Sequence, residues 1–149
     1  MNFLIDTSVL GRLADTSDPL NPVADQALVE LHRRGDALHI TPQNLIEFRS
    51  AATRAKSANG LGLSAAEVDG LAADFEATFP LLPETQDIYP AWKQVVAAVG
   101  AISKQVYDAR LVAVCHVHGI THMLTFNVVH FARFSAIPPG IIVVDPANV

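Results

Sequence analysis

The chain has 149 residues, of which half are hydrophobic and 17% are charged, and its formal net charge is −5. This length is typical of one domain with a substantial core, so we expect a single domain over residues 1–149. The longest apolar runs are too short to cross a bilayer, and we expect no membrane span. A net negative charge argues against general attraction to nucleic acid, so a polyanionic substrate would require a local basic patch or a bound cation.

The cysteine content and the N-terminus indicate the cellular compartment. The chain has one cysteine, Cys115, which cannot form an intramolecular disulfide or a cysteine-based metal site. The N-terminus lacks the basic segment of a signal peptide and carries Asp6 within its first apolar run. We therefore expect a cytoplasmic protein.

The first predicted element is a short strand, Phe3-Leu4-Ile5. An apolar run without alternation is typical of a strand that is buried on both faces of a parallel sheet. The strand ends on Asp6, where open α/β sheets bind ligands in the crevice outside the strand ends. The alternative is that Asp6 caps the following helix, which we expect over about residues 8–15.

The rest of the chain alternates between helix and strand signals. Helices are predicted over residues 22–34, 42–57, 64–78, 87–99 and 103–117, with a short one through residue 134. Strands are predicted over residues 38–40, 81–82, 122–125 and 141–144. Because helices separate the strands, the pairing should be parallel with right-handed crossovers. The sequence therefore predicts an α/β fold, a three-layer α/β/α sandwich with a central parallel sheet.

Three carboxylates are placed where they could carry chemistry: Asp6, Glu47 and Asp108. Asp108 lies in an almost wholly apolar helix, and burying an unpaired carboxylate costs several kcal/mol. Its partner would be Lys104 or Arg110, or else it converges with Asp6 on a hard cation such as Mg²⁺. Glu47 follows a predicted strand and lies off the core stripe of its helix. For Glu47 alone, the alternative is a solvated helix face.

Several other chemistries lack their motifs. The chain has no HExxH motif, no Cys/His zinc pattern, no Walker loop and no GxSxG elbow. A phosphatase of the haloacid dehalogenase type also places an Asp at the end of its first strand. That chemistry requires a second Asp two residues later, where this chain has Ser8.

Four ordered segments of the chain stand out: Leu4-Ile5-Asp6-Thr7-Ser8, Thr41 to Phe48, Val106 to Leu111, and Leu124-Thr125-Phe126-Asn127 with Phe131. Together these segments resemble the PIN-domain family, particularly the VapC-type toxins of prokaryotic toxin–antitoxin pairs. They span nearly the whole chain, and their order is far more specific than any one of them. The family commonly has an acidic residue at the position of His130, so this chain departs from the pattern there.

The resemblance implies a divalent-metal-dependent endoribonuclease that is the toxin of a type II toxin–antitoxin system. It implies Mg²⁺ or Mn²⁺ held by Asp6, Glu47 and Asp108, with Asn127 positioning a water or the phosphate. Clustered carboxylates raise one another's pKa unless a divalent ion lies among them, and that ion would activate a water for attack on the phosphate. The implied partners are RNA, a cognate antitoxin and a second copy of the chain.

Five basic side chains are candidates for a phosphate-positioning patch: Arg49, Arg54, Lys104, Arg110 and Arg133. The alternative function is a catalytically weakened PIN fold that serves as an RNA- or antitoxin-binding module, as His130 at the fourth acidic position would suggest.

Overall fold

Four parallel strands form the centre of the fold. The computed structural model describes all residues, 1–149. The strands are β1 (Asn2–Ile5), β2 (Ala37–His39), β3 (His122–Leu124) and β4 (Ile142–Val144). They are ordered β2-β1-β3-β4, and each neighbouring pair is parallel. The predicted parallel sheet is confirmed, although the segment 81–82 contributes only an isolated bridge between Leu81 and Ile40.

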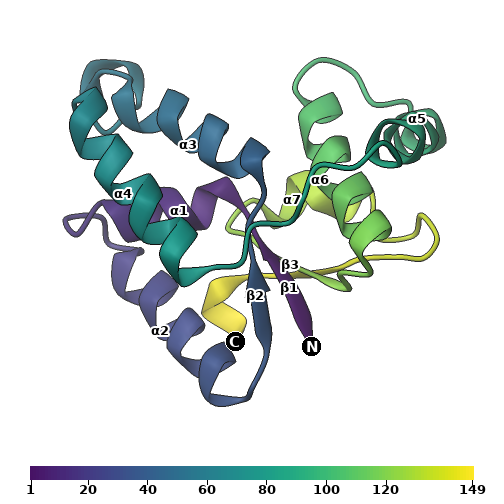
Figure 1. Cartoon of the computed structure of the whole chain (residues 1–149), viewed down its shortest axis with the longest axis horizontal. Helices are drawn as coiled ribbons and strands as arrows, with labels where there is room; N and C mark the ends of the chain where they lie inside the picture. The colour runs from purple at the N-terminus through teal and green to yellow at the C-terminus, as the bar shows by residue number, and fades with distance from the viewer.

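Helices cover both faces of the sheet. The α-helices are α1 (Thr7–Ala14), α2 (Asn21–Arg33), α3 (Pro42–Thr53), α4 (Ala65–Thr78), α5 (Ile88–Val99), α6 (Gln105–His118) and α7 (Val128–Ala132). Short 3-10 helices occupy Lys56–Ala58 and Pro146–Asn148. Figure 1 shows α1 to α4 on one side of the sheet and α5 to α7 on the other. The predicted three-layer α/β/α arrangement is therefore confirmed.

The central strand β1 is buried on both faces, as its unbroken apolar run predicts. Successive side chains of a strand point to opposite faces. Leu4 packs with Met123 against the layer of α5 and α6, whereas Phe3 and Ile5 pack against the layer of α1 to α4. Each of these side chains is at most 1% exposed. Two apolar cores thus meet at one sheet.

Local signals set several helix ends at the predicted residues. Ser64 accepts a hydrogen bond from the Glu67 amide at 3.1 Å, and the Glu67 carboxylate accepts one from the Ser64 amide at 2.7 Å. This capping box begins α4. Gly100 and Gly119 adopt left-handed backbone conformations directly after α5 and α6.

Two predicted boundaries are wrong. Helix α3 ends at Thr53, not near residue 57, and Ala55, which would have lain in the predicted helix, is exposed. The following loop folds back on the helix, where the amides of Gly62 and Leu63 bind the last free carbonyls at 2.8 and 2.9 Å. Helix α6 begins at Gln105, not at residue 103, because Ser103 has a φ of 51°.

The strand order places a crevice beside the end of β1. The chain passes from β1 to β2 on one side and later returns to β3 on the other side. Ligands of open α/β sheets bind at such a switch point, outside the carboxyl ends of the strands. Asp6 follows β1 at this point. None of the helices combines the length and the apolar character that a membrane span requires.

Candidate active site

Asp6 caps α1 and also lines the crevice, so the capping role and the ligand-binding position that the sequence offered as alternatives are both present. Its Oδ2 accepts hydrogen bonds from the Ser8 hydroxyl at 2.6 Å and the Thr125 hydroxyl at 2.7 Å. The Ser8 amide also donates to Oδ2, at 3.3 Å. The residue is 4% exposed, and its Oδ1 accepts no hydrogen bond. Three donors hold one oxygen, which leaves the other for a ligand.

Glu47 is held at both carboxylate oxygens. The Thr7 hydroxyl donates to Oε2 at 3.0 Å, and the Gln43 amide donates to Oε1 at 2.7 Å. The same Gln43 nitrogen donates to the Tyr107 carbonyl at 2.9 Å, and the Gln43 oxygen accepts from Arg110 at 3.0 Å. Glu47 is therefore half-buried in a network that links α3 to α1 and α6, and it does not lie on a freely solvated helix face.

Asp108 lies half-buried near the start of α6 and has neither a hydrogen bond nor an ion pair. The predicted pairing with Lys104 or Arg110 is wrong, because Arg110 pairs with Glu84 at 2.6 Å and Lys104 makes no ion pair. Burial, followed by the negative charge of Asp6, raises the pKa of Asp108 to about 6. The fold thus keeps this carboxylate beside other carboxylates without a side chain that hydrogen-bonds to it or forms an ion pair with it.

The three carboxylates line one groove of about 870 Å³ together with Asn127. Asp6 and Glu47 come from the layer of α1 and α3, and Asp108 comes from α6 across the sheet. Asn127 follows β3 and is exposed. All four residues that the sequence predicts for catalysis therefore meet at the carboxyl end of the sheet.

His130 lies on α7, is exposed and does not line the groove. Its ring makes no hydrogen bond. It is nevertheless close enough to act on the site. Its positive charge and that of Arg133 lower the pKa of Asp108, against the effect of burial. The structure thus places His130 at the margin of the groove.

The donor chemistry of the groove fits a hard divalent cation. Asp6 has a free oxygen, Asp108 has no partner, and the charge of Glu47 further raises the pKa of Asp108. Carboxylate oxygens are the ligands that Mg²⁺ and Mn²⁺ prefer. No three His, Cys, Asp or Glu side chains stand close enough to enclose an ion as they are, so a bound ion would have to draw the carboxylates together.

The candidate cations divide into two groups. Arg54, Lys104 and Arg110 line the groove. Arg49 pairs with Asp69 and Arg133 lies on the α7 side, and neither lines it. Only three of the five cations that the sequence offers for a phosphate-positioning patch therefore face the groove.

Three residues that support or line the groove escaped the sequence-based prediction. Thr125 holds Asp6, Gln43 holds Glu47, and Arg12 lines the groove from α1. The spacing of Gln43 and Glu47, four residues apart on one helix, was a usable signal. Thr125 and Arg12 had none of this kind, because their contacts depend on segments brought together by the fold.

The comparisons with known proteins agree with this fold. A family model described as the PIN domain matches residues 3–136. The chain belongs to the PIN domain family. The resemblance inferred from the ordered acidic segments is thereby confirmed. None of the curated proteins matches the sequence.

Solved PIN structures share the fold across nearly the whole chain. The VapBC2 complex of Rickettsia felis bound to a promoter DNA fragment matches with a TM-score of 0.73 at 11% identity, covering 97% of this chain and 98% of that chain. A toxin–antitoxin complex from Klebsiella pneumoniae matches with a TM-score of 0.62 at 22% identity, covering 98% of both chains. Mycobacterium tuberculosis VapC20, described as a sarcin–ricin loop cleaving toxin, matches with a TM-score of 0.61 at 18% identity, covering 87% and 93%. These identities show the fold.

Proposed function

We propose that this PIN-domain protein is a divalent-metal-dependent endoribonuclease and the toxin of a type II toxin–antitoxin system. The observation that carries the proposal is the meeting of Asp6, Glu47 and Asp108 in one groove, with Asp108 left unpaired. PIN domains are generally nucleases, and one structurally similar protein is described as a sarcin–ricin loop cleaving toxin. Cleavage of RNA in the cytoplasm would follow from this assignment.

The residues of the groove have separate tasks in the proposed reaction. Asp6, Asp108 and Glu47 would hold Mg²⁺ or Mn²⁺, which when bound lowers the pKa of a water and polarises the phosphate. The hydroxyls of Ser8 and Thr125 orient Asp6. These contacts hold the Asp6 carboxylate in place before substrate arrives.

The remaining groups position the substrate and Glu47. Thr7 and Gln43 fix the Glu47 carboxylate. The exposed amide of Asn127 lies at the groove, where it would donate to a phosphate oxygen or a water. Lys104 carries an unpaired positive charge on the same groove and would attract the phosphate backbone.

The decisive experiment removes one negative oxygen ligand at a time. We expect Asp6→Asn and Asp108→Asn each to abolish Mg²⁺-dependent cleavage of a labelled single-stranded RNA while keeping cooperative thermal unfolding. Asp74→Asn, an exposed residue of α4 outside the groove, is the control and should cleave as wild type does. Undiminished cleavage by either variant, in preparations free of contaminating ribonuclease, would contradict the assignment.

The second candidate is a PIN fold with weakened catalysis that binds RNA or an antitoxin. The observation in its favour is His130, which stands where the family has an acidic residue and lies outside the groove. Wild-type protein that binds RNA but does not cleave it with Mg²⁺ or Mn²⁺ would support this candidate over the nuclease.

We also propose a cognate antitoxin as partner, since one similar structure is described as a toxin–antitoxin complex and another as VapBC2 bound to a promoter DNA fragment. Co-expression with a small protein encoded beside the gene tests this. Co-purification together with inhibited RNA cleavage is the expected result, and failure of both would count against the partner.

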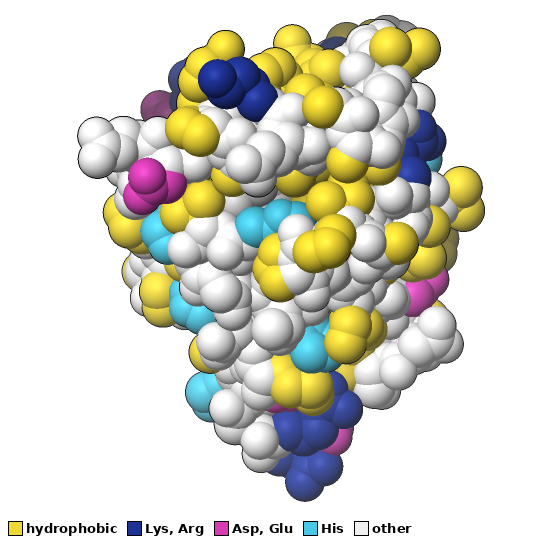
Figure 2. Space-filling model, turned by 90° about the vertical axis from the view of Figure 1, so that its right-hand side faces the viewer, with side chains coloured by type: hydrophobic (Ala, Val, Ile, Leu, Met, Phe, Trp, Pro, Cys, Tyr) yellow, Lys and Arg dark blue, Asp and Glu magenta, His cyan; other side chains and the backbone are white.

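A homodimer is the second proposed assembly. Figure 2 shows the face on the α5 and α6 side, where hydrophobic side chains gather and acidic ones are few. Tyr89 on α5 is 63% exposed, and Ile102 between α5 and α6 is 69% exposed. Such surface is typical of an interface. We expect Ile102→Glu to convert a dimer to a monomer in analytical ultracentrifugation, with Ile142→Glu on β4 as the control.

A further inference from the structure

The groove continues beyond the carboxylates to a basic end. Helices α1 and α3 both start near the strand ends and run away from them in the same direction (Figure 1). Asp6 lines the groove at the start of α1 and Glu47 at the middle of α3, whereas Arg12 lines it near the end of α1 and Arg54 directly after α3. At 1.5 Å per residue, Arg12 lies about 9 Å further along α1 than Asp6. Acidic and basic groups are thus separated along one hollow.

We propose that this basic end, formed by Arg12 and Arg54, binds a second phosphate of the RNA strand, away from the phosphate that is cleaved. The inference rests on the proposed ribonuclease function and names a phosphate subsite within it. Its ligand class is a polynucleotide strand, because only a polymer places a further phosphate at a set spacing from the scissile one.

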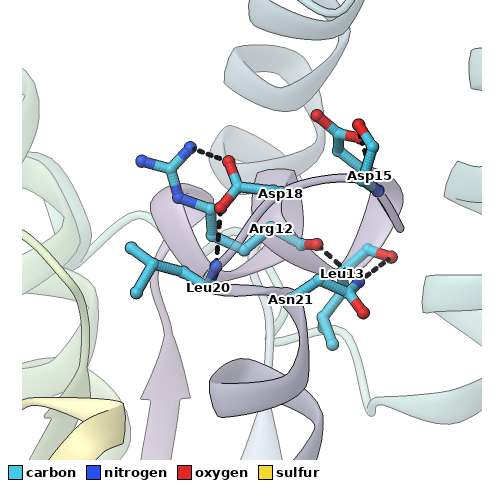
Figure 3. A network of polar contacts seen from close by, with 7 residues as sticks. Arg12, Leu13, Asp15, Asp18, Leu20 and Asn21 are labelled. Carbon is cyan, nitrogen blue, oxygen red and sulfur yellow. Dashed lines mark hydrogen bonds and ion pairs between the residues drawn. The ribbon is translucent and has the colours of Figure 1, made fainter.

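Arg12 is held in position by a network at the end of α1 (Figure 3). Its Nη1 donates to Asp18 at 2.8 Å, and the other oxygen of Asp18 accepts from the Leu20 amide at 2.8 Å. The Asn21 side chain donates to the Arg12 carbonyl at 2.8 Å and to the Leu13 carbonyl at 3.3 Å. These contacts tie the turn between α1 and α2 to Arg12.

The guanidinium of Arg12 retains donors that the protein does not use. Its Nε is buried without a hydrogen-bond partner, and its Nη2 makes no hydrogen bond. A buried donor without an acceptor costs free energy. A phosphate oxygen could accept from the free Nη2, because the charged guanidinium is a strong donor to phosphate, whereas the buried Nε is closed to solvent. Asp18 therefore orients Arg12 and leaves its other edge for an anion.

Arg54 adds a positive charge that no protein carboxylate neutralises. It is the cap residue directly after α3, and it makes no ion pair. Its carbonyl accepts a hydrogen bond from Gly62 at 2.8 Å. Gly60 lies so close that a Cβ there would overlap the Arg54 carbonyl, so only glycine lets the loop fold over this point. The loop closes the end of the groove and fixes the backbone that carries Arg54.

A phosphate-neutralisation series tests the subsite. A single-stranded RNA is cleaved in a set of versions, each with one phosphate replaced by an uncharged methylphosphonate. For wild type, neutralising one phosphate away from the cleavage point should slow cleavage about tenfold, the usual effect of one charge-assisted contact. Arg54→Gln and Arg12→Gln should cleave the unmodified RNA about tenfold more slowly and lose sensitivity to that methylphosphonate. The control is Arg33→Gln, because Arg33 pairs with Glu30 on α2 and lies outside the groove. This variant should keep the wild-type sensitivity to that methylphosphonate.

Binding provides a second readout that does not require catalysis. In the metal-free protein, the slope of log affinity against log salt should fall by about 0.7 in Arg54→Gln, as for one lost contact to a single strand. Arg54 has no ion pair, so this variant stays informative if Arg12→Gln unfolds. Wild-type sensitivity in both arginine variants would overturn the subsite alone, whereas a wild-type chain that neither binds nor cleaves RNA would overturn the proposed function with it.

Discussion

Asp108 shows at the scale of one residue how the fold maintains an unfavourable charge. It faces the groove without a partner, while the two nearby carboxylates are each held by hydroxyl or amide donors. Burial and the charge of Asp6 raise its pKa to about 6 from 3.8. A structural carboxylate would be expected to have a lowered pKa, as Asp36 has from its contact with the N-terminal amine. The contrast favours a binding role for Asp108.

The raised pKa of Asp108 predicts how the stability of the metal-free chain depends on pH. Between about pH 4 and 6 the folded state binds more protons at Asp108 than the unfolded state does, so this residue's contribution to stability falls as pH rises. Above pH 6 its charge is an uncompensated cost. We expect Asp108→Asn to be more stable than wild type at pH 7 by on the order of 1 kcal/mol, allowing for solvent screening.

Urea unfolding without divalent ions, from pH 4 to 8, measures this difference. It should shrink as pH falls towards 4, where Asp108 is protonated in the folded state and already partly protonated in the unfolded state. Asp74→Asn is the control for loss of an exposed charge. Equal stabilities of wild type and Asp108→Asn at pH 7 would show that the charge is compensated.

His130 acts on the same group from outside the groove. Its positive charge lowers the pKa of Asp108, so removing it should raise that pKa. We expect His130→Ala to shift the acid limb of the cleavage-rate profile to higher pH. Rates measured from pH 5 to 9, with the exposed His32→Ala on α2 as control, test this. Superimposable profiles would show that His130 has no influence on the site.

At the scale of elements, the end of α3 and the loop after it decide the shape of the groove. The helix ends at Thr53, and the amides of residues 61–63 return to its last carbonyls. Arg54 and the segment 59–61 consequently line the groove. If the helix continued to residue 57, Arg54 would follow Thr53 in helical rotation and would lie on a different side of α3.

This closure predicts an unequal response of two glycines to alanine. Gly60→Ala should destabilise the chain by about 2 kcal/mol, because the new methyl group would overlap backbone at Arg54. Gly70→Ala, inside α4 with open space around it, should stabilise by up to about 1 kcal/mol. Chemical denaturation of both variants checks the pair. Similar changes in stability in both variants would contradict the close approach of Gly60 to the Arg54 backbone.

Across the whole molecule, the site joins the two helix layers. Asp6 and Glu47 belong to the layer of α1 and α3, and Asp108 belongs to α6 on the other side of the sheet. Each layer has its own apolar core, so the carboxylates are the point at which a ligand would contact both. An ion bound there would stabilise the fold as a unit.

Divalent ions should therefore raise the melting temperature of the whole chain. A ligand present at about a hundred times its dissociation constant adds about 2.7 kcal/mol to stability. We expect Mg²⁺ or Mn²⁺ to raise the melting temperature of wild type in a concentration-dependent way and to leave Asp6→Asn and Asp108→Asn unchanged. Scanning calorimetry with and without a chelator measures it. An equal increase in all three proteins would place the ion elsewhere.

The sequence by itself determined the order and type of most elements. The apolar run of β1, the capping box at Ser64 and the glycines after α5 and α6 act within a few residues of themselves, so local pattern sufficed. The four ordered segments that contain Asp6, Glu47, Asp108 and Asn127 resemble the PIN family closely enough to indicate it. These features depend on neighbouring residues or on residue type alone.

Only the tertiary structure decided which groups pair and which remain free. The sequence favoured Lys104 or Arg110 as the partner of Asp108, but the packing of α6 brings Arg110 to Glu84 and Gln43 instead. It also places Thr125 on Asp6, across 119 residues of sequence. Contacts between residues so far apart in the sequence depend on strand order and crossover handedness, which no local pattern encodes. The unpaired state of Asp108 and the basic end of the groove both follow from those contacts.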